Sequence, residues 1–291
     1  MTRRTAAAVI LGLAVAGAAP AAETARQILD RQRALDSGER RWADRHERLR
    51  LVVVDPQRAA RELQLDLFDK KYPQSEQRTM VYVSAPDTVK GTAFLAITHA
   101  DRAADQWLYL PANQRARRIG GEVRKQGFVG TDLTYRDLDL LAELPSWTEA
   151  DAGSSLRDNE TLDGVPCHVV ELTPKRADID YQRIVLWLGR DDLVARQVEL
   201  YEIAPSSGWF GFGGDGAATA PTRRIHQSDV RLVGKVPVAH RVDVETPSAG
   251  TKTIVTFTDV TFDPGLPDDL FSQPAMEWGR YEPTGTGTAA P

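Results

Sequence analysis

The sequence has few of the residues from which catalytic and metal-binding sites are usually built. It contains one cysteine and five histidines, and no histidine pair has the spacing of a zinc-binding helix or a zinc finger. It contains no GxSxG nucleophile motif and no phosphate-binding glycine loop. Asp137 and Asp139, two positions apart, would point to different sides of a helix, which argues against a carboxylate pair. We therefore expect no enzymatic activity, no metal and no cofactor.

The single cysteine and the small net charge exclude two further classes of protein. One cysteine cannot form an internal disulfide, so packing must stabilise the fold, and Cys167 in GVPCHVVEL is expected to be a buried apolar residue rather than a reactive thiol. With 36 basic and 41 acidic residues the net charge is −5, which argues against a nucleic-acid-binding protein. The 291 residues, 42% of them hydrophobic, are enough for one large domain or two smaller ones.

Long hydrophobic runs are absent outside the N-terminus. There, Arg3 and Arg4 precede an apolar run that ends in APA, a small-residue cleavage pattern. We interpret residues 1–21 as the cleaved signal peptide of an exported protein; the alternative, a transmembrane anchor, would need a longer run. The folded domain is expected over residues 22–280, followed by a disordered tail at 281–291.

The pattern of apolar residues predicts a mainly β protein with a few helices. Thr24 and Gln27 have the spacing of a capping box and begin a first helix. The segment 61–71 alternates leucine with charged residues, and similar patterns recur at short intervals, so neighbouring strands should be antiparallel. We expect about five strands, a helical insert and about six more strands. A single antiparallel sheet of that many strands tends to curl.

The stretch 107–119, WLYLPANQRARRI, is predicted to be a hairpin with a turn at Pro111. Trp107 and Tyr109 would then share one face of the sheet and the intervening leucines the other. The returning strand is basic, and two interpretations stay open. It is either a charged sheet edge that discourages aggregation, or a docking site for anionic lipid head groups or an acidic membrane partner, formed by Arg115, Arg117 and Arg118.

A segment with a helical pattern, residues 127–144, lies between the two groups of strands. Gly127 and Gly130 suit a hinge, and Asp132 or Thr131 is expected to cap the helix. Two roles are open for this segment: a static core helix, or a lid over the mouth of the cavity that moves when a ligand enters. The lid candidates are Phe128, Val129, Asp132, Leu133 and Tyr135.

A long glycine-rich loop at 204–222 carries three aromatic residues. These residues either fold back onto the body of the protein or form an apolar tip that contacts a lipid or a partner. In the second interpretation the loop is a further docking element, with Trp209, Phe210 and Phe212 at its tip.

Several segments, in this order, resemble one known family. They are similar to consecutive motifs of the bacterial outer-membrane lipoprotein-sorting proteins, the LolA-like group. The similar segments are WLYLPANQRARRIGGEVRKQGFVGTDLTYRDL, GVPCHVVELTPK, YQRIVLWLGRDDLVARQVELYE and FDPGLPDDLFS. The similarity extends over residues 25–275, and where family members often have S-D-F this chain has Thr131-Asp132-Leu133.

The resemblance implies a periplasmic carrier that is soluble after cleavage of its signal peptide. The family's fold is a half-open antiparallel barrel over helices that plug its concave side, and its apolar cavity takes acyl chains of lipids or lipoproteins. Members of the longer group often accompany exporters of the resistance-nodulation-division (RND) type. We therefore expect acyl chains and an RND-type inner-membrane exporter as partners, no nucleic acid, and a monomer. Two alternatives stay open: a structural adaptor of an envelope complex with a filled cavity, and a hydrolase with an unusual site.

In a curled sheet, one face of each strand lines the cavity. A shift of one residue in the assignment of faces would invert every choice. The expected cavity residues are Leu65, Leu67, Val81, Val83, Phe94, Trp107, Tyr109, Leu186, Val198, Leu200, Val242 and Val255.

Overall fold

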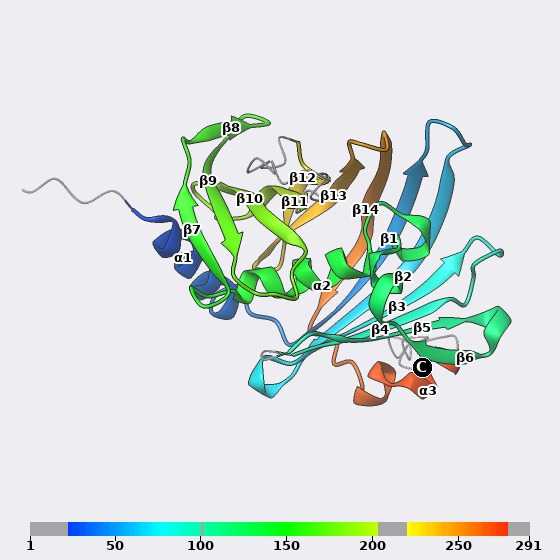
Figure 1. Ribbon diagram of the computed structural model, residues 1–291. Helices are drawn as coiled ribbons and strands as arrows, with labels where there is room; N and C mark the ends of the chain where they lie inside the picture. Colours follow the sequence, from blue (N-terminus) through cyan, green and yellow to red (C-terminus); the bar gives the residue numbers. More distant parts are fainter. Residues whose placement is uncertain (1–22, 100–101, 203–219, 279–291) are drawn as a thin grey trace, which may run out of the picture.

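The computed structural model describes residues 23–99, 102–202 and 220–278, about half of which belong to one antiparallel sheet of 14 strands (Figure 1). The strands before the insert are β1 (Asp44–Val54), β2 (Arg61–Lys71), β3 (Gln77–Ala85), β4 (Ala93–Thr98), β5 (Asp105–Leu110) and β6 (Arg115–Arg118). Those after it are β7 (Ala152–Leu156), β8 (Glu160–Leu162), β9 (Val165–Pro174), β10 (Tyr181–Gly189), β11 (Ala195–Glu202), β12 (Arg223–Val233), β13 (Val236–Thr246) and β14 (Thr251–Phe262).

The sheet is curled but not closed, which confirms the predicted fold class. Its strand order is β6-β5-β4-β3-β2-β1-β14-β13-β12-β11-β10-β9-β7, with β8 paired to β9, so β6 and β7 stand at the two ends of the curl. The last strand, β14, pairs with both β1 and β13 and joins the two halves of the chain. Six strands precede the helical insert and eight follow it, against about five and about six expected from the sequence.

Three α-helices accompany the sheet in the described parts of the chain: α1 (Ala25–Ser37), α2 (Tyr135–Glu143) and α3 (Gln273–Trp278). The capping box predicted at the start of α1 is present, because the side chains of Thr24 and Gln27 each bond the other's backbone nitrogen. Short 3₁₀ helices connect strands: η1 (Pro73–Ser75), η2 (Pro111–Asn113), η3 (Gly121–Lys125), η4 (Phe128–Gly130), η5 (Leu144–Ser146) and η6 (Asp268–Phe271). Within residues 23–99, 102–202 and 220–278, no helix is long and apolar enough to span a membrane.

The predicted hairpin at 107–119 is confirmed as β5 and β6 around η2. Gln114 follows the turn in a left-handed conformation with φ of 48°. Leu108 pairs with Arg117, and Tyr109 pairs with Ala116. Because side chains alternate along a strand, Arg117 shares the face of Leu108, while Arg118 lies on the face of Trp107, its register partner.

The face of the sheet turned towards α2 (Figure 1) is called here the concave face. Apolar side chains cover most of its width. On β1 its members are Leu49, Leu51 and Val53, all buried. Buried apolar side chains form one cluster over β1–β4 and β14 and a second over β9–β13. The helical insert packs on both, because Tyr135 belongs to the first cluster and Leu140 to the second.

The opposite, convex face is covered near β3–β6 by the C-terminal segment, η6 and α3 (Figure 1). Phe271 is buried there, and Trp107 and Tyr109 pack against the same cluster. These two residues were expected to line the cavity, and the structure corrects that assignment. Phe94 of the concave face pairs with Leu108, so the residues on either side of Leu108 must point to the convex face.

Cys167 is fully buried in a further apolar cluster, as expected for a structural cysteine. The expected signal peptide at 1–21, the expected tail at 281–291 and the aromatic residues of the long loop lie outside the described residues. The docking role expected for Trp209, Phe210 and Phe212 therefore stays a prediction.

Candidate functional site

The segment from Gly120 to Trp147, called here the insert, connects β6 to β7 and lies across the concave face. Three aromatic rings make its central contact with the sheet: Phe128 and Tyr135 of the insert and Phe94 of β4. The ring centroids are 5.6 Å apart for Phe94–Phe128, 5.4 Å for Phe94–Tyr135 and 5.7 Å for Phe128–Tyr135. Each such pair stabilises the contact by about 0.5–1.5 kcal/mol beyond the burial of its area.

Asp132 fastens the insert to the sheet where β13 turns into β14. Its buried carboxylate accepts hydrogen bonds from the hydroxyls of Thr246 at 2.7 Å, Thr253 at 2.7 Å and Thr251. Its backbone nitrogen donates to Thr253 Oγ1 at 2.9 Å, and its carbonyl oxygen accepts from Arg223 Nε at 2.7 Å. A carboxylate is tolerated in the interior only when it is hydrogen-bonded, so these contacts hold the insert at a defined position.

The prediction that Asp132 or Thr131 caps the helix is wrong, because α2 begins at Tyr135. Thr134 is the cap: its Oγ1 accepts from the backbone nitrogen of Asp137 at 3.1 Å, and Asp137 Oδ2 accepts from the backbone nitrogen of Thr134 at 2.8 Å. The two residues form a reciprocal capping box, in which Asp137 is the third residue of the helix. The Asp132 carboxylate is used for contacts with distant strands instead.

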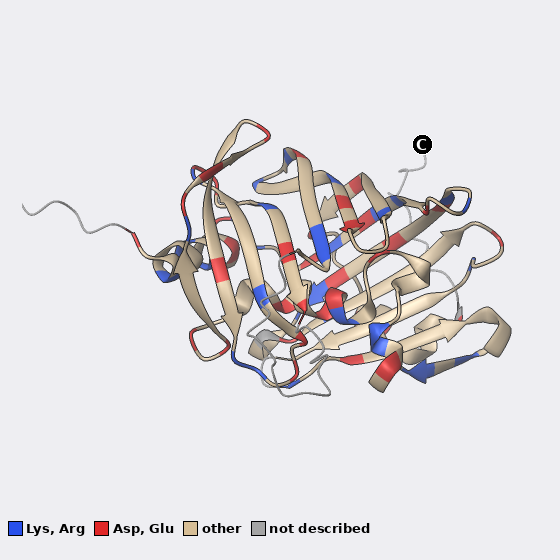
Figure 2. Ribbon diagram, turned by 45° about the horizontal axis from the view of Figure 1, so that its top comes forward, with Lys and Arg blue, Asp and Glu red and all other residues tan. Residues whose placement is uncertain are grey.

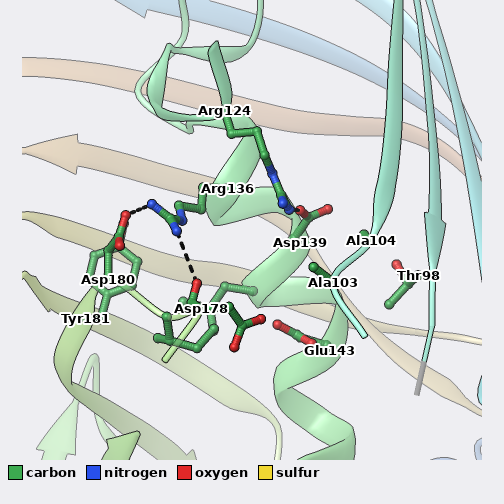
Figure 3. Close-up of a pocket in the computed structure, with 12 residues that line it drawn as sticks. Thr98, Ala103, Ala104, Arg124, Arg136, Asp139, Glu143, Asp178, Asp180 and Tyr181 are labelled. Carbon is green, nitrogen blue, oxygen red and sulfur yellow. Dashed lines mark hydrogen bonds and ion pairs between the residues drawn. The ribbon is translucent and has the colours of Figure 1, made fainter. Parts of the chain in front are cut away.

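The two aspartates of α2 have different surroundings. Asp137 is fully buried and accepts a hydrogen bond from the Tyr181 hydroxyl. Asp139 accepts from Gln106 Nε2 at 2.6 Å and forms an ion pair with Arg124 (Figure 3). Burial raises the pKa of Asp139 to about 6, although Arg124 acts in the opposite direction. Among the described residues, no group of three or more histidine, cysteine or acidic side chains is placed to hold a metal ion.

Ion pairs also join α2 to the connection between β9 and β10 (Figure 3). Arg136 pairs with Asp180 and donates to the carbonyl oxygen of Asp178 at 3.1 Å. Arg176 pairs with Glu143 at 2.8 Å, and burial raises the pKa of Glu143. A pocket of about 30 Å³ beside these groups has room for about two water molecules. Its size and its charged walls exclude it as a site for an acyl chain.

The backbone of η4 is tightly constrained. A Cβ on Gly127 would lie 2.4 Å from the carbonyl oxygen of Thr131, and a Cβ on Gly130, whose φ is +73°, would lie 2.8 Å from the Arg61 guanidinium. Arg61, at the rim of the sheet, donates to the carbonyl oxygen of Gly130 at 2.8 Å. Val129 has a φ of 47°, a left-handed conformation that costs a non-glycine residue about 1–2 kcal/mol. The two glycines thus allow close approach, and their role as a hinge stays a prediction.

Most of the predicted cavity residues are brought together on the concave face, where they belong to the two clusters or pack against them. They are Leu65, Leu67, Val81, Val83, Phe94, Leu186, Val198, Leu200, Val242 and Val255. The apolar lid candidates lie against the same face: Phe128, Val129, Leu133 and Tyr135. The structure does not test whether these residues bind a ligand or whether the insert moves.

The residues that hold the insert in place were not identified from the sequence. Thr246, Thr251 and Thr253 are separated from Asp132 by 114, 119 and 121 positions, so no local pattern connects them. Leu49 and Leu51 of the concave face were also missed. The alternation in RLRLVVV, the same signal that identified Leu65, could have found them.

The predicted docking arginines lie on β6, at one end of the strand order (Figure 2). Arg115 and Arg117 are exposed, and neither forms an ion pair with any other residue that the structure describes. Arg118 forms an ion pair with Asp105. Two of the three arginines are therefore available to a partner, although their docking role is untested.

Comparisons with known proteins show which solved structures have a similar fold. A family model described as an uncharacterized protein matches residues 75–206. A domain from Vibrio parahaemolyticus with the provisional name outer membrane lipoprotein-sorting protein superposes with a TM-score of 0.73 at 23% identity, covering 86% of this chain and 97% of that one. A DUF1329 family protein from Desulfovibrio piger gives 0.74 at 20% identity, with 87% and 97% covered. A LolA superfamily protein from Nitrosomonas europaea gives 0.61 at 16% identity, with 87% and 100% covered.

These solved structures confirm the resemblance to LolA-like, lipoprotein-sorting proteins at the level of the fold. At identities of 16–23% the shared property is the architecture. The comparison with curated proteins gave no match.

Proposed function

We propose that the protein is a periplasmic carrier that holds an acyl chain of a lipid or lipoprotein on the concave face of its sheet. The observation that carries this proposal is the row of aliphatic side chains across that face, covered by α1 and the insert rather than by a second sheet. The fold shared with a LolA superfamily protein and a lipoprotein-sorting domain supports the same class of cargo. The expected signal peptide supports the compartment.

Uptake of an acyl chain requires the insert to move, because the insert lies across the concave face. Polar contacts hold much of it: the Asp132 hydrogen bonds and the ion pairs of α2. A hydrogen bond to a charged group contributes about 1.5–3 kcal/mol net, because water replaces it when it opens. The apolar contacts of Phe128 and Tyr135 would be replaced by contacts between the sheet and the chain. Binding of the acyl chain must therefore offset the loss of the polar contacts that open.

The proposed cargo exchange takes place with an RND-type exporter of the inner membrane, and the carrier acts as a monomer. The exposed arginines of β6 are the proposed docking surface for the exporter or its anionic lipid surroundings. Replacing Arg115→Glu with Arg117→Glu should weaken association with anionic liposomes, by about 1 kcal/mol for each contact and less at high salt. The same double change at Arg48 and Arg50, exposed on the convex face, is the control. Unchanged binding at low salt would place docking elsewhere, with Trp209–Phe212 next to test.

A structural adaptor is the second candidate, and one observation favours it: side chains of α1 and the insert already cover the concave face. Mass spectrometry of an organic extract of the purified protein, followed by titration of the delipidated protein with a fluorescent fatty acid, separates the two. The carrier proposal expects a co-purified lipid and saturable binding of one chain per protein. An empty extract and no binding would contradict it and favour the adaptor. An ester-linked probe recovered in cleaved form would instead indicate a hydrolase.

A further inference from the structure

The concave face has polar groups at both ends of its apolar floor. The inward-facing residues of β1 are, in order, Arg45, Glu47, Leu49, Leu51 and Val53. β2 lies antiparallel beside it and presents Asp69, then three leucines, then Arg61. An elongated amphiphile whose chain lies on this floor must place its head group at one end or the other.

At one end, called here the acidic end, the inward-facing Arg45 is already paired with buried carboxylates. Arg45 lies 3.2 Å from Glu47 and 2.7 Å from Asp69, and the two carboxylate residues are only 2% and 1% exposed. Burial raises the pKa of Glu47. Lys71 at the same end places its ammonium 3.7 Å from the centre of the Trp42 ring. A negative head group at this end would meet two buried carboxylates, while Arg45 is already paired with both and Lys71 lies against the Trp42 ring, so this end disfavours it.

At the other end, a pocket of about 320 Å³ lies between the insert and the connection from β1 to β2. We call it the rim pocket, and its volume falls within the range of small-molecule sites. Val53 gives it an apolar wall that continues into the floor. Its positive charge comes from Arg58, whose side chain is 80% exposed, and from Arg61, which donates one hydrogen bond to the carbonyl oxygen of Gly130.

The acidic groups of the rim pocket leave these arginines available. Asp132 lines the pocket, but its carboxylate already accepts three threonine hydroxyls. Asp55 accepts from the backbone nitrogen of Gln57 at 2.9 Å and approaches Arg58 Nε only to 3.8 Å. Each guanidinium has five N–H donors in a planar fork. Most of the donors of Arg58 and Arg61 therefore have no partner within the described parts of the chain.

We infer that the rim pocket is the head-group site of the carrier and that it takes an anionic head group, a phosphate or a carboxylate, bound by Arg58 and Arg61. The inference rests on the proposed function and adds to it the class and the orientation of the cargo. The acyl chain runs from Val53 over the leucines of β1 and β2, beneath the insert, towards the acidic end. Paired N–H···O bonds from guanidinium groups bind phosphate and carboxylate, whereas a cationic head group would be repelled.

Two amphiphiles with the same chain test the assignment. Dodecyl phosphate and dodecyltrimethylammonium, each below its micelle concentration, compete with a fluorescent fatty acid for the delipidated protein. We expect dodecyl phosphate to bind at least about tenfold more tightly, as for a charge-assisted hydrogen bond. The double variant Arg58→Gln with Arg61→Gln should reduce this preference to about twofold. Its control, Arg48→Gln with Arg50→Gln, removes the same charge from the convex face and should keep the preference.

The ratio of the two affinities is the readout, because a change in the stability of the insert alters both affinities alike. Equal affinities in the wild type would overturn the inference and leave the carrier proposal standing. An equal loss of preference in the control variant would also overturn it, since the effect would then come from the overall charge. Inorganic phosphate that competes as well as dodecyl phosphate would identify a free-phosphate site and overturn the proposed orientation. If neither amphiphile binds, the proposed function fails together with the inference.

Discussion

Removal of the Asp132 carboxylate should release the insert while leaving the sheet folded. In Asp132→Ala the hydroxyls of Thr246, Thr251 and Thr253 lose their shared acceptor, and residue 132 keeps only its backbone hydrogen bonds to the sheet. The rest of the sheet is held by its strand ladders and by apolar clusters in which Asp132 takes no part. The effect should therefore be concentrated in the insert.

The expected loss in the free energy of opening the insert follows from the number and kind of hydrogen bonds that the Asp132 carboxylate accepts. A bond to a charged acceptor contributes about 1.5–3 kcal/mol, but three bonds to one carboxylate are not additive, and the freed hydroxyls find water or other partners. A buried hydroxyl that loses its acceptor and finds no other costs about 1–3 kcal/mol. We take about 3 kcal/mol as the loss in the free energy of opening the insert, which raises its open population on the order of 100-fold.

Hydrogen exchange followed by mass spectrometry measures this directly. Amides of the insert, over residues 128–141, should exchange on the order of 100-fold faster in Asp132→Ala, while those of β9–β11 change little. Asp259→Ala is the matched control. Asp259 is an exposed aspartate, and its ion pair with Arg48 is a long contact of 4.0 Å. Exchange of the insert in Asp132→Ala that stays within about twofold of the wild type would refute the reasoning, since it would mean that other contacts hold the insert.

Two further variants test the packing and the charge of the insert. Gly127→Ala should cost about 1–3 kcal/mol in urea unfolding, because the added methyl meets the carbonyl oxygen of Thr131 at 2.4 Å. Gly120→Ala, where a Cβ meets nothing within 4 Å, should change stability by less than about 0.5 kcal/mol, and similar losses in both variants would contradict the clash. Asp139 has its pKa raised to about 6 in the folded protein, so its contribution to stability is present below about pH 4 and is lost as the pH rises to about 6. Asp139→Asn should therefore gain about 2 kcal/mol relative to the wild type between pH 4 and pH 7, and a difference that does not vary with pH would show that Arg124 compensates for burial.

The alternation of apolar residues was enough to predict the sheet and most of the concave face. Leu65, Leu67, Val81 and Val83 lie on the concave face together, as predicted, because consecutive hairpins keep their register. Trp107 and Tyr109 lie on the convex face instead, because α3 covers that face at β5 and buries the apolar residues there. That helix packs there from a distant part of the chain, which no pattern around Trp107 reveals.

The attachment of the insert was beyond sequence reasoning for a related reason. Asp132 precedes a helical pattern, and an aspartate in that place is normally a good cap. Thr134 and Asp137 form a better one, since their spacing gives a reciprocal pair, and this signal could have been found. The partners of Asp132 are threonines of strands that the fold brings into place, and only the three-dimensional arrangement shows them.

A reversible lock on the insert tests the central claim most directly. Thr253 Oγ1 lies 2.7 Å from the Asp132 carboxylate, so Asp132→Cys with Thr253→Cys, in a Cys167→Ala background, brings two thiols together across the contact. Uptake of a fluorescent fatty acid is then measured with the disulfide formed and after its reduction, with mass spectrometry to verify each state. The account predicts that the oxidised protein takes up no fatty acid and that reduction restores uptake. Equal uptake in both states would contradict it, because the acyl chain would then bind somewhere other than beneath the insert.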